Sequence, residues 1–246
     1  MKAVLLAAGL GTRLKPLTDR IPKCLIPIQG KPLLEIWIDL LEKHRFREVL
    51  INTHHHAAQV EEFIARKKKR AAIKITLFNE PELLGSGGTL LANKAFVCDE
   101  KDFLIAYSDN LTNMDLDKFI DFHRLCIHKG AILTMGLFHA QDPRACGIAV
   151  LDKGQRIVKF TEKPETPESD LANGGIYMAT GKIFNFFPEA NSPKGIIDLG
   201  KHVLPALCGK MYGYKVTAYL RDIGTLESYR KALEEWPDRP ESKTAL

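Results

Sequence analysis

A glycine-rich stretch near the N-terminus carries two cationic side chains that could hold a polyphosphate. An apolar run over residues 4–8 leads into Gly9 and Gly11, Arg13 follows at once, and Lys23 comes later between prolines. Backbone N–H groups of such a loop can cradle phosphate oxygens, while Arg and Lys supply the opposing charge. An ordinary turn that needs glycine only for its positive φ would have the same glycine pattern. The stretch therefore indicates phosphate binding without establishing it.

Two common phosphate motifs do not fit this stretch. A dinucleotide fingerprint would need glycine at position 14, where this chain has Leu14. A P-loop would need Gly-Lys-Ser or Gly-Lys-Thr, which is absent. A nicotinamide-dependent oxidoreductase is therefore contradicted at Leu14, and the stretch predicts a different kind of phosphate loop.

Two aspartates follow apolar runs at positions where they could bind a metal ion. Asp109 comes after the run 103–107, and Asp222 comes after the run 212–220. Mg²⁺ in phosphate-binding sites prefers a few carboxylates together with phosphate oxygens and water. Each aspartate could instead cap a helix or a turn, which is the commoner role of a lone aspartate. Two such carboxylates near a phosphate loop predict a Mg²⁺ site.

The second half of the chain offers polar groups that suit a sugar. Glu162 and Lys163 end a predicted strand. Glu162 could accept hydrogen bonds from sugar hydroxyls, and Lys163 could bind a phosphate. Alternatively, the two could form an exposed ion pair that contributes little to stability. The stretch Asn-Gly-Gly at 173–175 could present amides to a sugar or form a turn. No Ser or Cys lies in a nucleophile elbow. Nucleotidyl transfer needs none, because positioning and charge stabilisation dominate such reactions.

Strands and helices that alternate along the first half must position these groups. We expect strands over 48–52, 73–78, 103–107 and 131–138, and helices that begin at Pro32 and span 57–68, 89–96 and 116–128. Such alternation predicts βαβ units in a mostly parallel sheet, whose ligands bind beyond the carboxyl ends of the strands. The phosphate loop, a loop over 79–88 and Asp109 all fall at that end of the sheet.

The second half is organised differently and has no clear domain boundary before it. We expect a hairpin over 147–151 and 156–161, strands over 175–179 and 212–220, and a last helix over 226–236. We interpret this half as the lid or substrate-holding part of one domain.

Composition narrows the class of protein. The chain has 246 residues, a net charge of +5 and Lys and Arg scattered along it, which does not indicate nucleic-acid binding. Its five cysteines are odd in number and include no Cys-x-x-Cys pair, which favours reduced thiols. The N-terminal apolar run is too short for a signal peptide or a membrane span. We therefore expect a soluble cytoplasmic protein without a nucleic-acid or membrane partner.

Short blocks of residues, each weak alone, together form a specific signature over nearly the whole chain. The blocks lie at 6–18, 22–27, 84–88, 108–110, 162–164, 173–177 and 221–225. In this order they resemble the sugar-1-phosphate nucleotidylyltransferases, also called NDP-sugar pyrophosphorylases, in the short form without a C-terminal β-helix. The chain departs from the usual pattern at Cys24, Ser108, Cys146 and Leu220, and none of these removes a charged catalytic group.

The resemblance implies a Rossmann-like α/β fold, with a mostly parallel sheet flanked by helices and an inserted sugar-binding β region. It implies one domain over 1–246, with a nucleotide-binding half over about 1–140, a sugar-binding half over about 141–236 and a tail over 237–246. It also implies that a sugar 1-phosphate attacks the α-phosphorus of a nucleoside triphosphate in the presence of Mg²⁺, and that pyrophosphate leaves.

The resemblance assigns roles by position. The implied nucleotide contacts are Ala8, Gly9, Gly11, Thr12, Arg13, Lys23, Gly87 and Gly88. The implied sugar contacts are Gly147, Glu162, Lys163, Asn173 and Gly175. The implied catalytic groups are Arg13, Lys23, Asp109, Lys163 and Asp222, of which Asp109 and Asp222 would hold Mg²⁺.

The glycine-rich block at 84–88 bears on the choice of substrates. Its Gly-Ser-Gly-Gly sequence resembles the loops of members that transfer guanylyl groups to mannose or heptose phosphates, so GTP with such a phosphate is favoured. The alternatives are members that use UTP, dTTP or CTP with another sugar, an amino sugar or phosphocholine. A non-catalytic regulatory subunit that only binds a nucleotide sugar is a further alternative, and the oligomeric state stays open.

Overall fold

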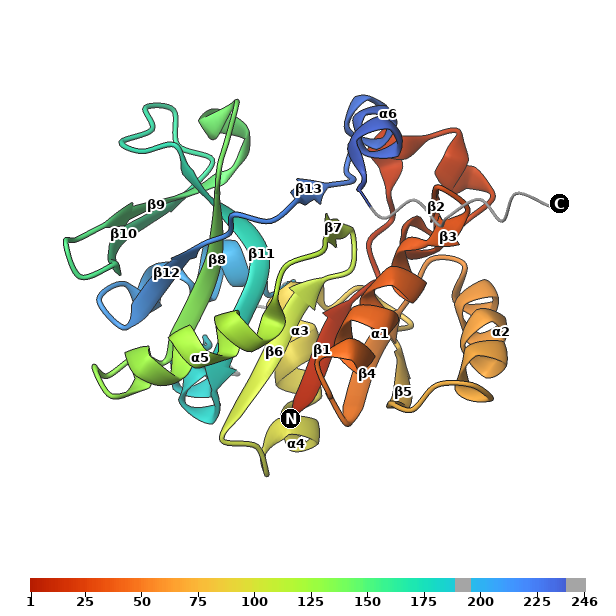
Figure 1. The fold of residues 1–246 in the computed structure, drawn as a ribbon, viewed down its shortest axis with the longest axis horizontal. Coiled ribbons are helices and arrows are strands. Elements are labelled where there is room, and N and C mark those ends of the chain that lie inside the picture. The colour runs from red at the N-terminus through yellow and green to blue at the C-terminus, as the bar shows by residue number, and fades with distance from the viewer. Residues whose placement is uncertain (189–195, 238–246) are drawn as a thin grey trace, which may run out of the picture.

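The computed structural model describes residues 1–188 and 196–237, and Figure 1 shows them as one central sheet with helices on both faces. The predicted tail over 237–246 lies outside the described residues except for Pro237. The helices are α1 (Leu33–Lys43), α2 (Ala57–Lys68), α3 (Gly85–Ala92), α4 (Lys94–Val97), α5 (Leu116–Ile127) and α6 (Leu226–Glu235). No helix among these residues is both long and apolar enough to cross a membrane.

The main sheet has nine strands in the order β5-β4-β1-β6-β11-β8-β12-β10-β9. The strands of the first half are β1 (Lys2–Leu6), β4 (Glu48–Thr53), β5 (Lys74–Asn79) and β6 (Asp102–Tyr107). The remaining strands are β8 (Leu133–His139), β9 (Gly147–Leu151), β10 (Arg156–Glu162), β11 (Leu171–Thr180) and β12 (Met211–Lys215). Only β10 and β11 run against the others, so the predicted α/β fold with a mostly parallel sheet is confirmed.

The central strand β1 is buried on both faces, because helices cover each side of the sheet. Val4 and Leu6 pack into a core with α3 and α4, whereas Ala3 and Leu5 pack into a core with α1, α2 and α5. Successive side chains of a strand point to opposite faces, so a short continuous apolar run is what such a strand requires. The loop that follows β1 is therefore anchored on a fully buried strand.

The helix predicted over 89–96 is wrong in its extent. Helix α3 already begins at Gly85, and a separate short helix α4 follows it. The amides of Gly87 and Gly88 both donate to the Ile197 carbonyl oxygen, at 2.8 and 3.1 Å. The first N–H groups of a helix lack partners within the helix, and a carbonyl from a distant segment satisfies them here.

The strand predicted over 212–220 is also wrong in its extent. Strand β12 ends at Lys215, and a short strand β13 (Leu220–Asp222) leaves the main sheet to pair with β7 (Asn110–Thr112). The remaining two-stranded ribbon joins β2 (Pro27–Ile28) to β3 (Lys31–Pro32). The pairing of β13 with β7 brings the end of the chain back to the carboxyl end of β6.

Candidate active site

The glycine loop after β1 has a compact shape that a side chain at Gly11 would prevent. Gly11 has a positive φ of 64°, and a Cβ there would lie 2.7 Å from Thr18 Cγ2. The Thr18 hydroxyl donates to the Gly11 carbonyl oxygen at 2.8 Å. Arg13 follows in a single 3-10 turn, Thr12–Leu14, and its side chain is exposed. The loop thus closes on itself and leaves the Arg13 guanidinium outside, where a ligand can meet it.

Lys23 lies between the two predicted metal-binding aspartates. Its side chain is only 10% exposed, and its ammonium donates to the Asp109 carboxylate. The distance from Lys23 Nζ to Asp222 Oδ1 is 3.7 Å. Residues from three distant parts of the chain therefore meet at the carboxyl ends of β1 and β6, as the sequence predicted for that edge of the sheet.

The β7–β13 ribbon holds the two aspartates near each other. Asp222 is opposite Asn110 in this ribbon, and the Ile223 amide donates to the Asp109 carbonyl oxygen at 2.9 Å. Burial and then the Asp109 charge raise the pKa of Asp222, while Lys23 and Arg13 act in the opposite direction. Two carboxylates that repel each other beside a phosphate loop form a donor set that fits a divalent cation.

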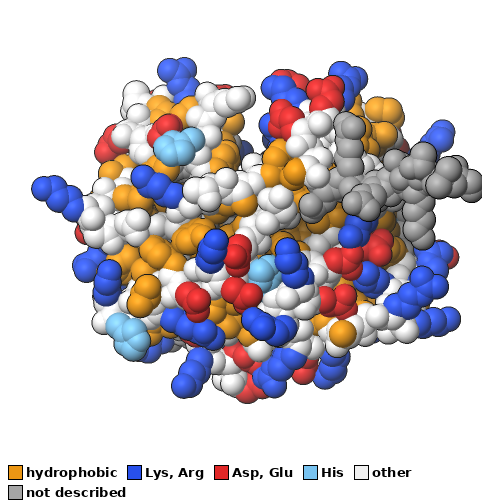
Figure 2. Space-filling view, in the orientation of Figure 1, with side chains coloured by type: hydrophobic (Ala, Val, Ile, Leu, Met, Phe, Trp, Pro, Cys, Tyr) orange, Lys and Arg blue, Asp and Glu red, His pale blue; other side chains and the backbone are white. Residues whose placement is uncertain are grey.

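A pocket lies beside this pair and includes part of the glycine loop. It is lined by residues that end or follow β1 and β6, by one residue of β4, by the segment from Glu80 into α3, and by Lys23 and Asp198. Its lining includes Ala7, Ala8, Gly9, Asn52, Glu80, Ser86, Thr89, Tyr107 and Asp109. Figure 2 shows the outline hollowed at its upper edge, between the part that carries α6 and the part that carries β9 and β10. The pocket contains predicted nucleotide contacts together with residues that the sequence analysis did not identify.

A buried polar network forms one wall of the pocket, and the sequence analysis missed it. Glu80 is 1% exposed, and its carboxylate accepts from Asn52 Nδ2 at 2.8 Å, from Thr89 Oγ1 at 2.5 Å and from the Leu84 amide at 3.1 Å. Asn52 Oδ1 in turn accepts from the Ala7 amide at 2.6 Å. The network therefore couples the phosphate loop to the start of α3.

Gly87 and Gly88 lie at the start of α3, where the segment around Ile197 passes close by. A Cβ on Gly87 would lie 2.6 Å from Ile197 Cγ2, so these glycines allow two backbones to approach. Next to them, Ser86 Oγ donates to Asp198 Oδ2 at 3.2 Å, and Asp198 lines the pocket. The sequence offered no signal for Asp198, because its contact with Ser86 spans more than a hundred residues.

Glu162 lies at the end of β10 and faces two glycines. A Cβ on Gly147 would lie 2.6 Å from Glu162 Oε2, and one on Gly200 would lie 2.9 Å from it. Burial and then the Asp198 charge raise the pKa of Glu162, which Lys163 and Lys201 lower. The Glu162 carboxylate therefore lies against the backbone of both glycines.

Lys163 is exposed and has a positive φ of 50°, a conformation that few residues other than glycine adopt. Its amide donates to the Cys146 carbonyl oxygen at 3.0 Å. The Cys146 thiol lies within electrostatic reach of both Glu162 and Asp222. Burial, then the charges of Asp222, Asp142 and Glu162, raise its pKa, and Lys163 lowers it. The sugar-side groups therefore lie near the aspartate pair.

Asn173 and Gly175 lie in β11, where an irregularity interrupts its pairing with β8. Asn173 Nδ2 donates to the Tyr177 hydroxyl at 2.7 Å, and Asn173 Oδ1 accepts from the Gly175 amide at 2.9 Å. Gly175 has a φ of 64°, and a Cβ there would lie 2.4 Å from Asn110 Nδ2. These contacts fix the bulge next to β7, and neither residue is among those that line the pocket.

Proteins of similar sequence and structure are known. The family model for nucleotidyl transferases matches residues 2–239. A mannose-1-phosphate guanylyltransferase of Mycobacterium tuberculosis is 32% identical over 231 residues, which are 92% of this chain but only 62% of that protein. A D-glycero-α-D-manno-heptose 1-phosphate guanylyltransferase of Aneurinibacillus thermoaerophilus is 31% identical over 236 residues, 96% of this chain and 98% of that protein. HddC from Yersinia pseudotuberculosis, complexed with GMP-PN, has a TM-score of 0.76 and 26% identity, and the match covers 96% of this chain and 99% of that chain.

Proposed function

The chain belongs to the nucleotidyl transferase family, and we propose that it transfers a nucleoside monophosphate from a nucleoside triphosphate to a sugar 1-phosphate. Pyrophosphate leaves, and a nucleoside diphosphate sugar is formed. The main support for this proposal is that Lys23, Asp109 and Asp222 lie close together beside the glycine loop. Such a meeting of a cation and two carboxylates suits the charge of a triphosphate and its metal ion.

In the proposed reaction, an oxygen of the sugar phosphate forms a bond to the α-phosphorus. The bond from that phosphorus to the pyrophosphate oxygen breaks, and the electron pair leaves with pyrophosphate. Arg13 would neutralise charge on the departing pyrophosphate, and Lys23 would bind phosphate near the reacting centre. Lys163 would hold the sugar phosphate, and Glu162 would accept hydrogen bonds from sugar hydroxyls. No side chain needs to become covalently attached.

Asp109 and Asp222 would hold Mg²⁺, which when bound supplies positive charge to the phosphate oxygens. The fit is supported by the repulsion between the two carboxylates, which contributes to the raised pKa of Asp222. Lys23 contacts the same pair, so its ammonium balances part of that charge when no ligand is bound.

GTP is the nucleoside triphosphate that we propose as donor. The support is the Gly-Ser-Gly-Gly block at 84–88, which resembles guanylyl-transferring members, and the names of two guanylyltransferase relatives. Glu80 lies in the pocket wall, but its buried carboxylate already accepts from Asn52, Thr89 and the Leu84 amide. Its role is therefore to hold that wall in place.

The acceptor that we propose is mannose 1-phosphate or a heptose 1-phosphate. Support comes from the names of two relatives, a mannose-1-phosphate and a manno-heptose 1-phosphate guanylyltransferase. Donors with uracil, thymine or cytosine, and amino-sugar or choline phosphate acceptors, are the alternatives.

The experiment that tests this function is a pyrophosphate-release assay over a panel of triphosphates and sugar 1-phosphates with Mg²⁺. We expect release with GTP plus mannose or heptose 1-phosphate. Release only with UTP, dTTP or CTP would contradict the guanine assignment and leave the reaction class intact. Tight binding of triphosphate and sugar phosphate with no release for any pair would favour the non-catalytic subunit.

A further inference from the structure

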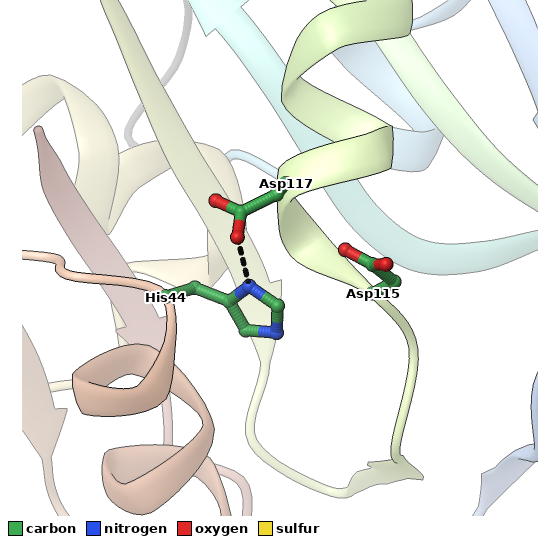
Figure 3. Close-up of side chains that lie close together, drawn as sticks. All are labelled: His44, Asp115 and Asp117. Carbon is green, nitrogen blue, oxygen red and sulfur yellow. Dashed lines mark ion pairs between the residues drawn. The ribbon is translucent and has the colours of Figure 1, made fainter.

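A second group of potential metal ligands lies where α1 ends and α5 begins. His44 follows the last turn of α1, Asp115 caps the N-terminus of α5, and Asp117 lies in the first turn of α5. One possible ligand atom from each residue lies within 4.8 Å of the other two. Figure 3 shows the imidazole between the two carboxylates. None of these residues belongs to the pocket described above.

His44 is an unusual member of this group, because it is buried without a hydrogen bond. Its side chain is 6% exposed, and neither ring nitrogen makes a hydrogen bond to residues 1–188 or 196–237. Nδ1 lies 3.1 Å from Asp117 Oδ2 but without hydrogen-bond alignment (Figure 3). A buried polar atom without a partner destabilises a fold by about 1–3 kcal/mol, so such atoms usually have a bound water, ion or special role.

We propose that His44, Asp115 and Asp117 bind a divalent transition-metal ion such as Zn²⁺ or Co²⁺. One imidazole and two carboxylates are a donor set that these ions accept, with water completing the coordination. Metal–ligand bonds of about 2.1 Å in a tetrahedron place neighbouring ligand atoms roughly 3.4 Å apart. The 3.1 Å between His44 Nδ1 and Asp117 Oδ2 is near that value. Asp115 is 45% exposed, so its carboxylate is accessible to an ion.

Two cationic side chains compete for the same carboxylates. Arg45 Nη2 lies 3.4 Å from Asp117 Oδ2, and Lys118 Nζ lies 3.7 Å from Asp115 Oδ2. Both side chains are largely exposed, at 82% and 76%, and exposed pairs of this kind contribute little. Asp115 Oδ1 accepts from the Lys118 amide at 3.1 Å, which leaves Oδ2 to bind an ion. A dication can therefore displace both cations without breaking the helix cap.

The ion would act on stability rather than on chemistry. It would join the end of α1 to the start of α5, two helices that cover the same face of the sheet. A ligand that binds only the native state stabilises it by mass action. We therefore expect Zn²⁺ to raise the melting temperature by roughly 2–4 °C.

The test is a titration of the full-length protein with Co²⁺ and Zn²⁺ in excess Mg²⁺, which occupies the aspartate pair of the proposed active site. We expect one equivalent of Co²⁺ to bind, with visible absorption bands that Zn²⁺ abolishes. Asp117→Asn and His44→Gln should each weaken binding by about tenfold or more. His139→Ala is the matched control, because His139 forms an exposed pair with Asp170 at 2.8 Å and should not affect binding.

Unchanged Co²⁺ affinity in Asp117→Asn, or no stoichiometric binding in the wild type, would overturn the proposal. Loss of binding in His139→Ala would do the same, because it would locate the ion elsewhere. If His44→Gln fails to fold, Asp117→Asn still decides, because Asp117 is 49% exposed and tolerates an isosteric change.

Discussion

The Lys23 ammonium lies against the Asp109 carboxylate, although the two residues are 86 positions apart. Lys23 lies in a 3-10 turn (Lys23–Leu25), and Asp109 follows the end of β6. The same ammonium lies 3.7 Å from Asp222. The ammonium offsets one of the two carboxylate charges, and a triphosphate with its metal ion would exchange these partners.

Replacing Asp222 should separate the chemistry of the site from its stability. We expect Asp222→Asn to lower pyrophosphate release by about 10²–10³-fold, because a charged group in contact with the reacting phosphates is lost. The lost attraction to Lys23 is offset by the lost repulsion from Asp109, and the size of the side chain is kept, so the melting temperature should change little. Asp121→Asn, on the exposed side of α5, is the control. Wild-type turnover in Asp222→Asn would show that this carboxylate does not hold the metal ion.

Replacing Lys23 should reveal the repulsion that it now balances. Lys23→Met leaves Asp109 and Asp222 facing each other, and we expect a loss of about 1–2 kcal/mol in the free energy of unfolding. Adding Asp109→Asn to this variant should restore part of that loss, because one of the repelling charges is then gone. Denaturant unfolding of the two single variants and the double variant measures this coupling, and strictly additive effects would contradict it.

Replacing Glu80 tests the buried network beside the pocket. Glu80→Gln keeps the shape but turns one acceptor oxygen into a donor, so the free energy of unfolding should fall by about 1–3 kcal/mol. Glu82→Gln is the control, because Glu82 is exposed to solvent two positions later. Denaturant unfolding measures both variants, and equal stability would show that the Glu80 carboxylate does not hold the network together.

Substituting Gly85 tests the contact between the start of α3 and the distant segment that contains Ile197. A Cβ at Gly85 would lie 2.3 Å from Ile196 Cγ2 and 2.5 Å from the Ile197 carbonyl oxygen, and φ is 79°. We expect Gly85→Ala to destabilise the fold by about 2 kcal/mol, which is roughly 4–8 °C in melting temperature. Gly181→Ala has no atom within 4 Å of the new Cβ and should be nearly neutral. Equal melting temperatures for the two variants would refute the close approach.

Cys24 should make stability depend on pH in the alkaline range. Burial, more than any other cause, raises the pKa of its thiol to about 12. An unfolded thiol releases its proton near pH 8.5–9, so from there to about pH 12 deprotonation favours the unfolded chain and stability falls. Cys24→Ala should flatten this part of the stability curve. At pH 8, a thiol reagent should label the exposed Cys98 and leave Cys24 unmodified, and fast labelling of Cys24 would contradict the assignment.

Some elements could be predicted because their signal is local. Helix α2 spans the predicted residues 57–68, since apolar positions at helical spacing mark a buried face whatever the neighbours are. The strand that ends at Tyr107 places Asp109 at the carboxyl edge of the sheet for a similar reason. The same local reasoning failed over 212–220, because pairing with β7 draws Leu220–Asp222 away from the main sheet.

Glu80 shows why part of the site escaped prediction. It lies in a polar stretch where Glu82, two positions later, is exposed to solvent. No sequence pattern distinguishes the buried glutamate from the exposed one. Glu80 is buried because Asn52 and Thr89, from β4 and α3, fold over its carboxylate. Asp198 likewise reaches the pocket only because its segment packs on the glycines of α3.

The sequence by itself determined most kinds of element and the family, and it singled out Lys23, Asp109 and Asp222, because side-chain periodicity and short motifs are properties of neighbouring residues. The tertiary structure alone decided which strands pair, that β11 lies between β6 and β8, and that Lys23 stands between Asp109 and Asp222. It also decided that Glu80 and Asp198 line the same pocket. Such contacts depend on the packing of segments far apart in the chain, which no local pattern encodes.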